Sequence, residues 1–212
     1  MNEARGFGEE PLPQTVEVAS AMRRMVSLLV STEHEHPVVD DMVRTFAEWE
    51  QRLAGDAVTD PLPRMGSTEG RLYLRHAFDV WEFNPCFPEY HFDAADDEDA
   101  ASGTVTFPLV FEGPPGHVHG EFLGVFFDCV VQQHNCLGSQ PSGMTRTMTI
   151  TYRRPVPLAR ALRFDITRTR EDRGVHSTSR LLDGDQVLCE ADVTAVPIPT
   201  ERLAGFEFGA RT

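Results

Sequence analysis

A Pro/Gly turn that leads into an almost wholly apolar segment constrains this chain more than any other feature. The turn lies at residues 113–117, and from Phe122 to Val131 every residue except Gly124 and Asp128 is apolar or Cys. A helix on the surface of a protein would carry polar residues along one face. The segment therefore predicts a helix, over about residues 119–135, that is buried on nearly all sides.

Asp128 is the one carboxylate within this apolar segment. An ionised carboxylate that is buried without a partner loses much of its hydration free energy, so we expect a partner, a raised pKa or a substrate on which it acts. Gly120 marks the predicted start of the helix. Free backbone N–H groups and the positive end of the helix dipole would there stabilise negative charge that develops on a ligand.

Period-two alternation of apolar and polar residues predicts antiparallel strands after the helix. From Met144 to Tyr152, for example, apolar residues alternate mainly with threonines, which indicates one buried and one wetter face. The pair Asp183-Gly184 is typical of a tight hairpin. The predicted strands cover residues 104–111, 144–154, 161–170, 175–182 and 186–196.

The first part of the chain is predicted to form two helices followed by a loop. Apolar residues recur at helical spacing over residues 15–30 and 40–54, whereas 56–67 contains two prolines and reads as a loop. Residues 93–103 are acidic and are expected to form a solvated turn or linker. We therefore divide the chain into a helical extension with a loop (1–83), an α+β domain (84–200) and a C-terminal tail (201–212).

Charge and composition exclude several functions. The chain has no lysine, so Schiff-base chemistry is excluded, and its net charge of −14 argues against nucleic acid as a partner. No run of apolar residues is long enough to cross a membrane, and the N-terminus lacks the pattern of a signal peptide, so a cytoplasmic location without membrane partners is expected. His117 and His119 could supply two metal ligands, but no acid or Cys stands at a supporting spacing, and the four cysteines form no CxxC pair, so no metal is expected.

Several motifs together resemble one enzyme family. They are His119-Gly120, Asp128 in an apolar helix, the preceding 111–115 (FEGPP), the following Thr145 and 152–157 (YRRPVP), and the earlier 84–88 (NPCFP). In this order and spacing they resemble the PaaI-like branch of the hotdog-fold acyl-CoA thioesterases. The resemblance spans about residues 84–197. It implies an α+β hotdog fold, in which an antiparallel sheet wraps around one long apolar helix, here with an N-terminal helical extension.

The resemblance also implies roles for particular residues. Asp128 would activate water as a general base or attack the thioester as a nucleophile, and His119 with Gly120 would polarise the thioester carbonyl. Thr145 of the partner subunit would hold the water or the carboxylate. Such proteins pair their sheets edge to edge, so a homodimer or a dimer of dimers with active sites between subunits is expected. Coenzyme A would enter as part of the substrate, with no other cofactor.

Two arginines are candidates for binding the nucleotide of coenzyme A. Arg153 and Arg154 end a predicted strand just before Pro155, in an arginine-rich stretch of an acidic chain. A guanidinium group matches the oxygens of a phosphate. The resemblance would place this strand end near the nucleotide.

Glu121 departs from the family pattern, which has a second Gly after His-Gly. Its side chain could crowd the thioester and its charge would oppose a developing oxyanion, or it could point away, or it could itself handle the water. Two functions therefore stay open. One is the hydrolysis of an acyl-CoA, and the other is a non-catalytic module that binds acyl-CoA or regulates a partner.

Overall fold

A computed structural model describes residues 13–56, 84–93, 99–136, 143–172 and 174–197. The predicted C-terminal tail (201–212) lies outside these residues, and so does the loop predicted at 56–67 except for Asp56, which ends a helix. The predicted domain boundaries at 83 and 200 also fall outside them, so the division into domains stays a prediction.

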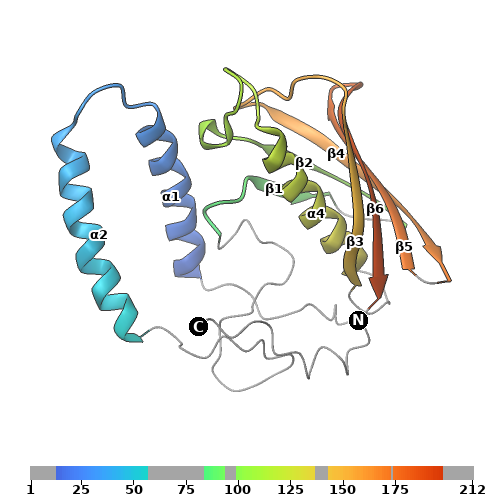
Figure 1. The fold of residues 1–212 in the computed structure, drawn as a ribbon, viewed down its shortest axis with the longest axis horizontal. Coiled ribbons are helices and arrows are strands. Elements are labelled where there is room, and N and C mark those ends of the chain that lie inside the picture. The colour runs from blue at the N-terminus through green and yellow to red at the C-terminus, as the bar shows by residue number, and fades with distance from the viewer. Residues whose placement is uncertain (1–12, 57–83, 94–98, 137–142, 173, 198–212) are drawn as a thin grey trace.

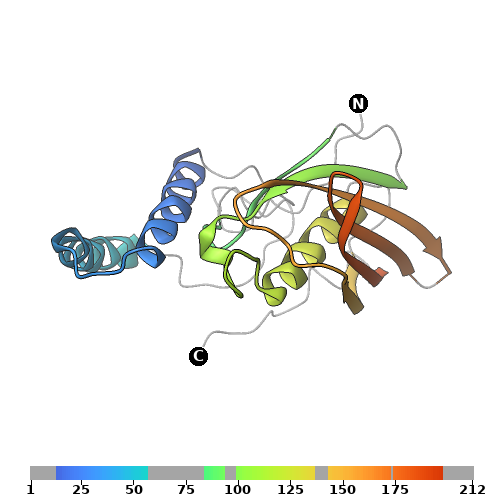
Figure 2. The same cartoon turned by 90° about the horizontal axis from the view of Figure 1, so that it is seen from above.

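A six-stranded antiparallel sheet forms the body of the molecule, with strand order β1-β2-β4-β5-β6-β3 (Figure 1). Helix α4, Gly120–Cys136, packs across the inner face of this sheet, which curves around it (Figure 2). This is the predicted α+β arrangement. The strands are β1 Glu89–Phe92, β2 Ala100–Thr106, β3 Gly143–Tyr152, β4 Ala161–Glu171, β5 Gly174–Asp183 and β6 Gln186–Pro197.

Aromatic residues fill the core between α4 and the sheet. Phe126 is fully buried and meets the rings of Tyr90, Phe107 and Phe164 edge to face, at centroid distances of 5.5 to 6.1 Å. Such contacts stabilise a core beyond the burial of their area. They fix the rotation of α4 about its axis and therefore decide which of its side chains face away from the sheet.

Helix α4 is less enclosed than its apolar sequence predicts. Leu123, Phe127 and Val130 are buried against the sheet, but Val125 is 46% exposed. The prediction of burial on nearly all sides is thus wrong for the single chain, because the sheet covers only one side of the helix. The uncovered side includes an apolar residue that a second chain could cover.

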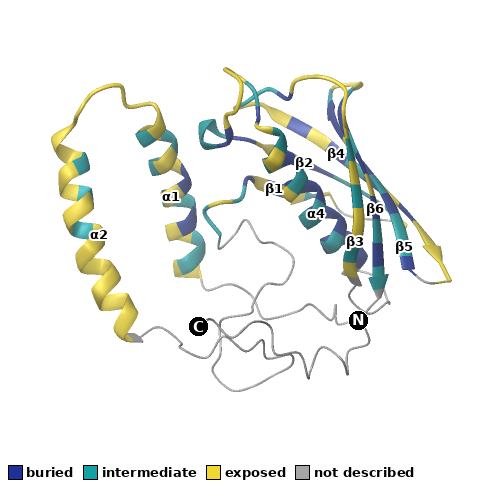
Figure 3. Cartoon of the chain, in the orientation of Figure 1, coloured by how far each residue is buried: buried dark blue, intermediate teal, exposed yellow. Residues whose placement is uncertain are grey.

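An N-terminal helical hairpin stands beside the domain (Figures 1 and 2). Its helices are α1, Pro13–Val30, and α2, Pro37–Asp56, and both begin at a proline, which suits the first turn of a helix. Helix α1 contacts the domain at the short 3-10 helix η1, Leu109–Phe111. Helix α2 lies on the far side of α1 and is mostly exposed (Figure 3). None of the described helices is long and apolar enough to span a membrane.

Most elements lie within a few residues of their predicted bounds, but the start of the sheet differs. The strand predicted at 104–111 ends at Thr106 and gives way to η1, because Pro108 cannot donate a ladder hydrogen bond. The expected acidic linker at 93–103 is wrong from Ala100 onward, where β2 already pairs with β4. Strand β1 was not predicted, since its four residues are too few for a clear alternation.

Candidate active site

A tight turn precedes helix α4 and is held by its own backbone and one carboxylate. The Gly113 N–H donates to the His117 carbonyl (2.9 Å), and the Gly116 N–H donates to the Glu112 side chain (2.6 Å). Gly116 has a φ of +78°, a conformation that favours glycine. The Pro/Gly composition of the turn thus has a structural cause. Glu112, although part of the quoted motif, was not predicted to hold the turn.

His119 is fixed at the end of this turn. Its backbone N–H donates to the Phe111 carbonyl (2.9 Å), and its ring Nδ1 accepts the Glu121 backbone N–H (3.3 Å). In a neutral ring the proton therefore lies on Nε2, which makes Nε2 the donor toward a ligand. The side chain is 48% exposed, so a ligand can reach it.

Gly120 offers a backbone donor at the helix start. The Glu121 N–H is used by His119 Nδ1 and the Phe122 N–H by the His119 carbonyl (3.1 Å), whereas no described residue accepts the Gly120 N–H. The Tyr152 hydroxyl donates to the Gly120 carbonyl (3.0 Å), and a Cβ at Gly120 would lie 3.3 Å from the Tyr152 ring. Tyr152 thus positions the helix start. This role was not predicted, although the residue belongs to the quoted motif.

Asp128 lies two turns further along α4 and has a partner. The Thr145 hydroxyl on β3 donates to Asp128 Oδ1 (2.6 Å), and the Gln132 side-chain amide donates to the same hydroxyl. The carboxylate is half-buried, which agrees with the expectation that it needs a partner. Gln132 was not predicted, although its position one turn after Asp128 places both on one face of the helix.

The origin of Thr145 differs from the expectation. We expected the threonine of a partner subunit to meet Asp128, but the structure shows the contact within one chain. The reason is that β3 follows α4 and returns alongside it, which brings Met148 and Ile150 close to Gly124 as well. The Asp128 and Thr145 pair is therefore complete without a second chain.

The two halves of the predicted site are not brought together within one chain. Gly120 and Asp128 are eight residues apart on the same helix, which corresponds to about 12 Å along its axis. The backbone donor and the carboxylate cannot both contact one thioester group from the same copy. Glu121 does not lie between them, since its side chain is 90% exposed, with its carboxylate 4.0 Å from His119 Nδ1.

Arg153 and Arg154 follow directly after Tyr152, at the end of the molecule that carries Gly120. Arg153 is paired with Glu190, to which its Nε donates (2.6 Å). Arg154 is exposed and forms no ion pair within the described parts of the chain. Of the two predicted phosphate-binding residues, Arg154 is thus the one whose guanidinium group is available to a ligand.

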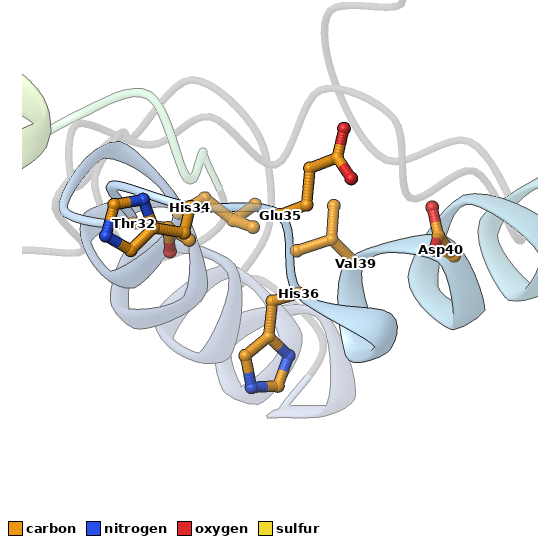
Figure 4. Close-up of a pocket in the computed structure, with 7 residues that line it drawn as sticks. Thr32, His34, Glu35, His36, Val39 and Asp40 are labelled. Atoms are coloured by element: carbon orange, nitrogen blue, oxygen red, sulfur yellow. The ribbon is translucent and has the colours of Figure 1, made fainter.

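In the part of the chain that the structure describes, other reactive side chains do not form a second centre. Burial, followed by the nearby Asp128 charge, raises the pKa of Cys129 to about 12, so this thiol is a poor nucleophile. A polar cavity lies at the turn between α1 and α2, but its side chains His34, Glu35 and His36 point in different directions (Figure 4). Within the described ranges, no three His, Cys, Asp or Glu residues are placed to hold a metal ion.

Comparison with known proteins gives a clear result for structure only. No protein-family model and no curated protein matches the chain. The crystal structure of a thioesterase superfamily protein matches with a TM-score of 0.73 at 23% identity, over 89% of this chain and 98% of that one. This overlap is long enough to require similarity in the helical extension as well as in the domain.

Two other structures are similar over about half of the chain. One is a phenylacetic acid degradation-related protein from Ralstonia eutropha, with 22% identity, a TM-score of 0.46 and coverage of 50% of this chain and 83% of that one. The other is a thioesterase protein from Streptococcus pneumoniae solved with coenzyme A, at 17% identity, a TM-score of 0.46 and coverage of 51% and 87%. These two likenesses are too weak to support a conclusion. The longer match shows the fold alone: this chain has the same hotdog fold as that thioesterase superfamily protein.

Proposed function

We propose that this protein hydrolyses an acyl-CoA thioester to a free acid and coenzyme A. The observation that carries the proposal is the Asp128 carboxylate, held by the Thr145 hydroxyl at 2.6 Å on the apolar helix of a hotdog fold. A hydrogen-bonded, half-buried carboxylate has a fixed direction. It can therefore act on a water molecule or on an acyl carbon that binds beside the helix.

The reaction can follow two routes that use the same carboxylate. In the first, Asp128 accepts a proton from water, the water oxygen bonds to the thioester carbon, the C–S bond breaks, and the thiolate sulfur receives a proton. In the second, an Asp128 oxygen bonds to that carbon as the C–S bond breaks, and water then hydrolyses the resulting anhydride. Neither route needs a cofactor, since coenzyme A is part of the substrate.

The start of α4 would stabilise the oxyanion. The Gly120 N–H points out of the helix end, where the helix dipole favours negative charge, and His119 Nε2 supplies a second donor. Tyr152 holds the carbonyl of Gly120 and so helps to fix the residue that carries the proposed N–H donor. Arg154, near the same end, would bind a phosphate of coenzyme A.

Two copies of the chain would complete each site. Because Gly120 and Asp128 of one copy are about 12 Å apart, the thioester would take its oxyanion donors from one subunit and its carboxylate from the other. Strand β3 forms one edge of the sheet and is ten residues long. Strand β1 forms the other edge and has only four residues. A long edge strand is suited to pair with another chain. We propose a homodimer that joins two sheets along β3.

Release of free coenzyme A tests the proposal. Purified protein would be incubated with acetyl-, octanoyl- and phenylacetyl-CoA, and thiol release followed with a colorimetric reagent. Release that depends on protein concentration supports the hydrolase. No release from any of the three contradicts it.

A non-catalytic acyl-CoA-binding module is the second candidate. Glu121 favours it, because this acid beside His119 opposes negative charge at the proposed oxyanion site. Equilibrium binding separates the two functions. The module predicts saturable binding of octanoyl-CoA without the release of coenzyme A, whereas the hydrolase predicts turnover.

A further inference from the structure

A cavity of about 300 Å³ lies between the helical hairpin and the beginning of α4. Its size falls at the lower end of small-molecule sites, about 300 Å³ and upward. None of the described residues that line it is charged. An apolar group could fill it, whereas a phosphate or a carboxylate would lose its hydration there without compensation.

The outer wall of the cavity comes from the hairpin. Met25 and Leu29 of α1 line it together with Met42 and Phe46 of α2. Methionine side chains are flexible and adapt to apolar ligands of different shape. Phe46 is 45% exposed, so the wall on the α2 side is incompletely packed.

The inner wall is part of the proposed catalytic turn. Phe111 and Phe122 line the cavity, with ring centroids 5.0 Å apart. The Phe111 carbonyl accepts the His119 backbone N–H, and the Phe122 N–H donates to the His119 carbonyl. The His119 and Phe122 rings are 6.2 Å apart. The cavity thus begins next to the residues that would polarise the thioester.

We propose that this cavity binds the acyl group of the substrate, so that the enzyme prefers acyl-CoAs with an extended apolar acyl group over acetyl-CoA. The inference rests on the proposed function, because it assigns the acyl end of the same site. The thioester would lie at His119 and Gly120, with coenzyme A leading toward Arg154 and the acyl group entering beneath the hairpin. The N-terminal helices therefore select the substrate.

The first test compares substrates of different chain length. Values of kcat/KM would be measured for acetyl-, butyryl-, hexanoyl- and octanoyl-CoA. Each added methylene that enters the cavity is expected to raise kcat/KM by up to about fourfold until the cavity is filled. A kcat/KM that does not rise with chain length overturns the inference, while turnover of acetyl-CoA would leave the hydrolase proposal standing.

The second test uses neighbouring leucines of α1 as a matched pair. Leu29 lines the cavity, whereas Leu28 is 64% exposed and does not. Leu29→Trp is expected to lower the ratio of kcat/KM for octanoyl-CoA to that for acetyl-CoA by about tenfold or more. Leu28→Trp should leave this ratio unchanged. If Leu29→Trp and Leu28→Trp have the same ratio of kcat/KM for octanoyl-CoA to that for acetyl-CoA, whether unchanged or equally lowered, the inference is overturned.

Binding measurements keep the inference testable if no turnover is found. Calorimetry would compare octanoyl-CoA with free coenzyme A for the intact protein, Leu29→Trp and Leu28→Trp. Tighter binding of octanoyl-CoA that only Leu29→Trp removes supports the cavity even if the hydrolase proposal fails. Val26→Trp, at the rim of the cavity, gives a second filling variant should Leu29→Trp unfold, and thermal unfolding monitors both. Equal affinity for both ligands overturns the inference.

Discussion

Single hydrogen bonds between α4 and β3 decide what the Asp128 carboxylate can do. Thr145 donates to Asp128 and accepts from Gln132, so the threonine hydrogen is directed at the carboxylate. One Asp128 oxygen thereby accepts a hydrogen bond, and within the described ranges no hydrogen bond to the other oxygen is formed, so this oxygen can accept one from water or substrate. A serine at 145 could keep this arrangement, whereas a valine could not.

Glu121 is expected to slow the reaction through its charge. The carboxylate lies 4.0 Å from His119 Nδ1 and is 90% exposed, so its effect on an oxyanion is screened by solvent. We predict that Glu121→Gln raises kcat by about two- to fivefold, since a charge at a helix start is typically worth this much. The measurement is steady-state turnover at low and high salt. An unchanged or lower kcat at low salt would show that Glu121 does not oppose the oxyanion.

The sequence identifies some of these residues but not their contacts. Asp128 stands out as an acid in an apolar segment, and His119, Gly120 and Thr145 follow from the family motif. Tyr152 and Gln132 could not be assigned roles in advance, because the first depends on how β3 packs against α4 and the second on a hydrogen bond across the two elements. Thr145 was expected from a second chain for the same reason, since the sequence does not show that β3 packs against α4 of its own chain.

At the level of elements, the turn before α4 requires glycine at 113. A Cβ there would lie 2.8 Å from the His119 Cα, so the backbone at His119 would have to move. We predict that Gly113→Ala lowers stability by about 1–3 kcal/mol and also lowers kcat, because the oxyanion donors shift. Thermal unfolding and turnover check this.

Gly55 in α2 provides the matched control for that substitution. Its added Cβ would meet nothing within 4 Å, so Gly55→Ala should preserve turnover and keep or slightly raise the melting temperature. If both variants behave alike, the close contact at Gly113 does not constrain the turn.

Patterning predicts long elements better than short ones. The bounds of α4 agree within about two positions with those predicted from its apolar segment, and the bounds of β4 to β6 agree as closely with those predicted from the alternation of residues. The beginning of β2 was missed because Ala100 to Gly103 follow an acidic run and lack large apolar residues. The pairing of these residues with β4, and not their own composition, makes them a strand.

The whole molecule should lose stability at alkaline pH. Burial raises the pKa of Cys129 to about 12 and that of Cys189 to about 11, from an ordinary value of 9.0. The unfolded chain therefore releases these protons at lower pH than the folded chain. The stabilisation is fully present below pH 9 and is lost as the pH rises toward 12.

Urea unfolding at pH 8 and pH 10, under reducing conditions, measures this effect. The free energy of unfolding should fall between the two values, and the fall should be smaller in Cys129→Ala and in Cys189→Ala. Cys86 is exposed, so Cys86→Ala should show the same fall as the unchanged protein. Equal stability at pH 8 and pH 10 would contradict the assignment.

Shared active sites can be tested with mixed dimers. One copy would carry Asp128→Asn and the other His119→Ala, and a different affinity tag on each copy would allow the mixed dimer to be isolated. If each site takes its carboxylate from one subunit and its oxyanion donors from the other, one of the two sites is intact. Turnover should then recover to roughly half that of the unchanged dimer. Activity no higher than that of either parent variant would contradict sharing.

The most direct test of the proposed hydrolase is the turnover of Asp128→Asn. Asparagine keeps the shape of the side chain and can still accept the Thr145 hydrogen bond, but it cannot take a proton from water or act as the carboxylate nucleophile. We predict that kcat for octanoyl-CoA falls by about a hundred- to ten-thousandfold, with the melting temperature nearly unchanged. Asp185→Asn, an exposed change in the hairpin between β5 and β6, serves as the control. If Asp128→Asn releases coenzyme A as fast as the unchanged protein, Asp128 has no part in the reaction.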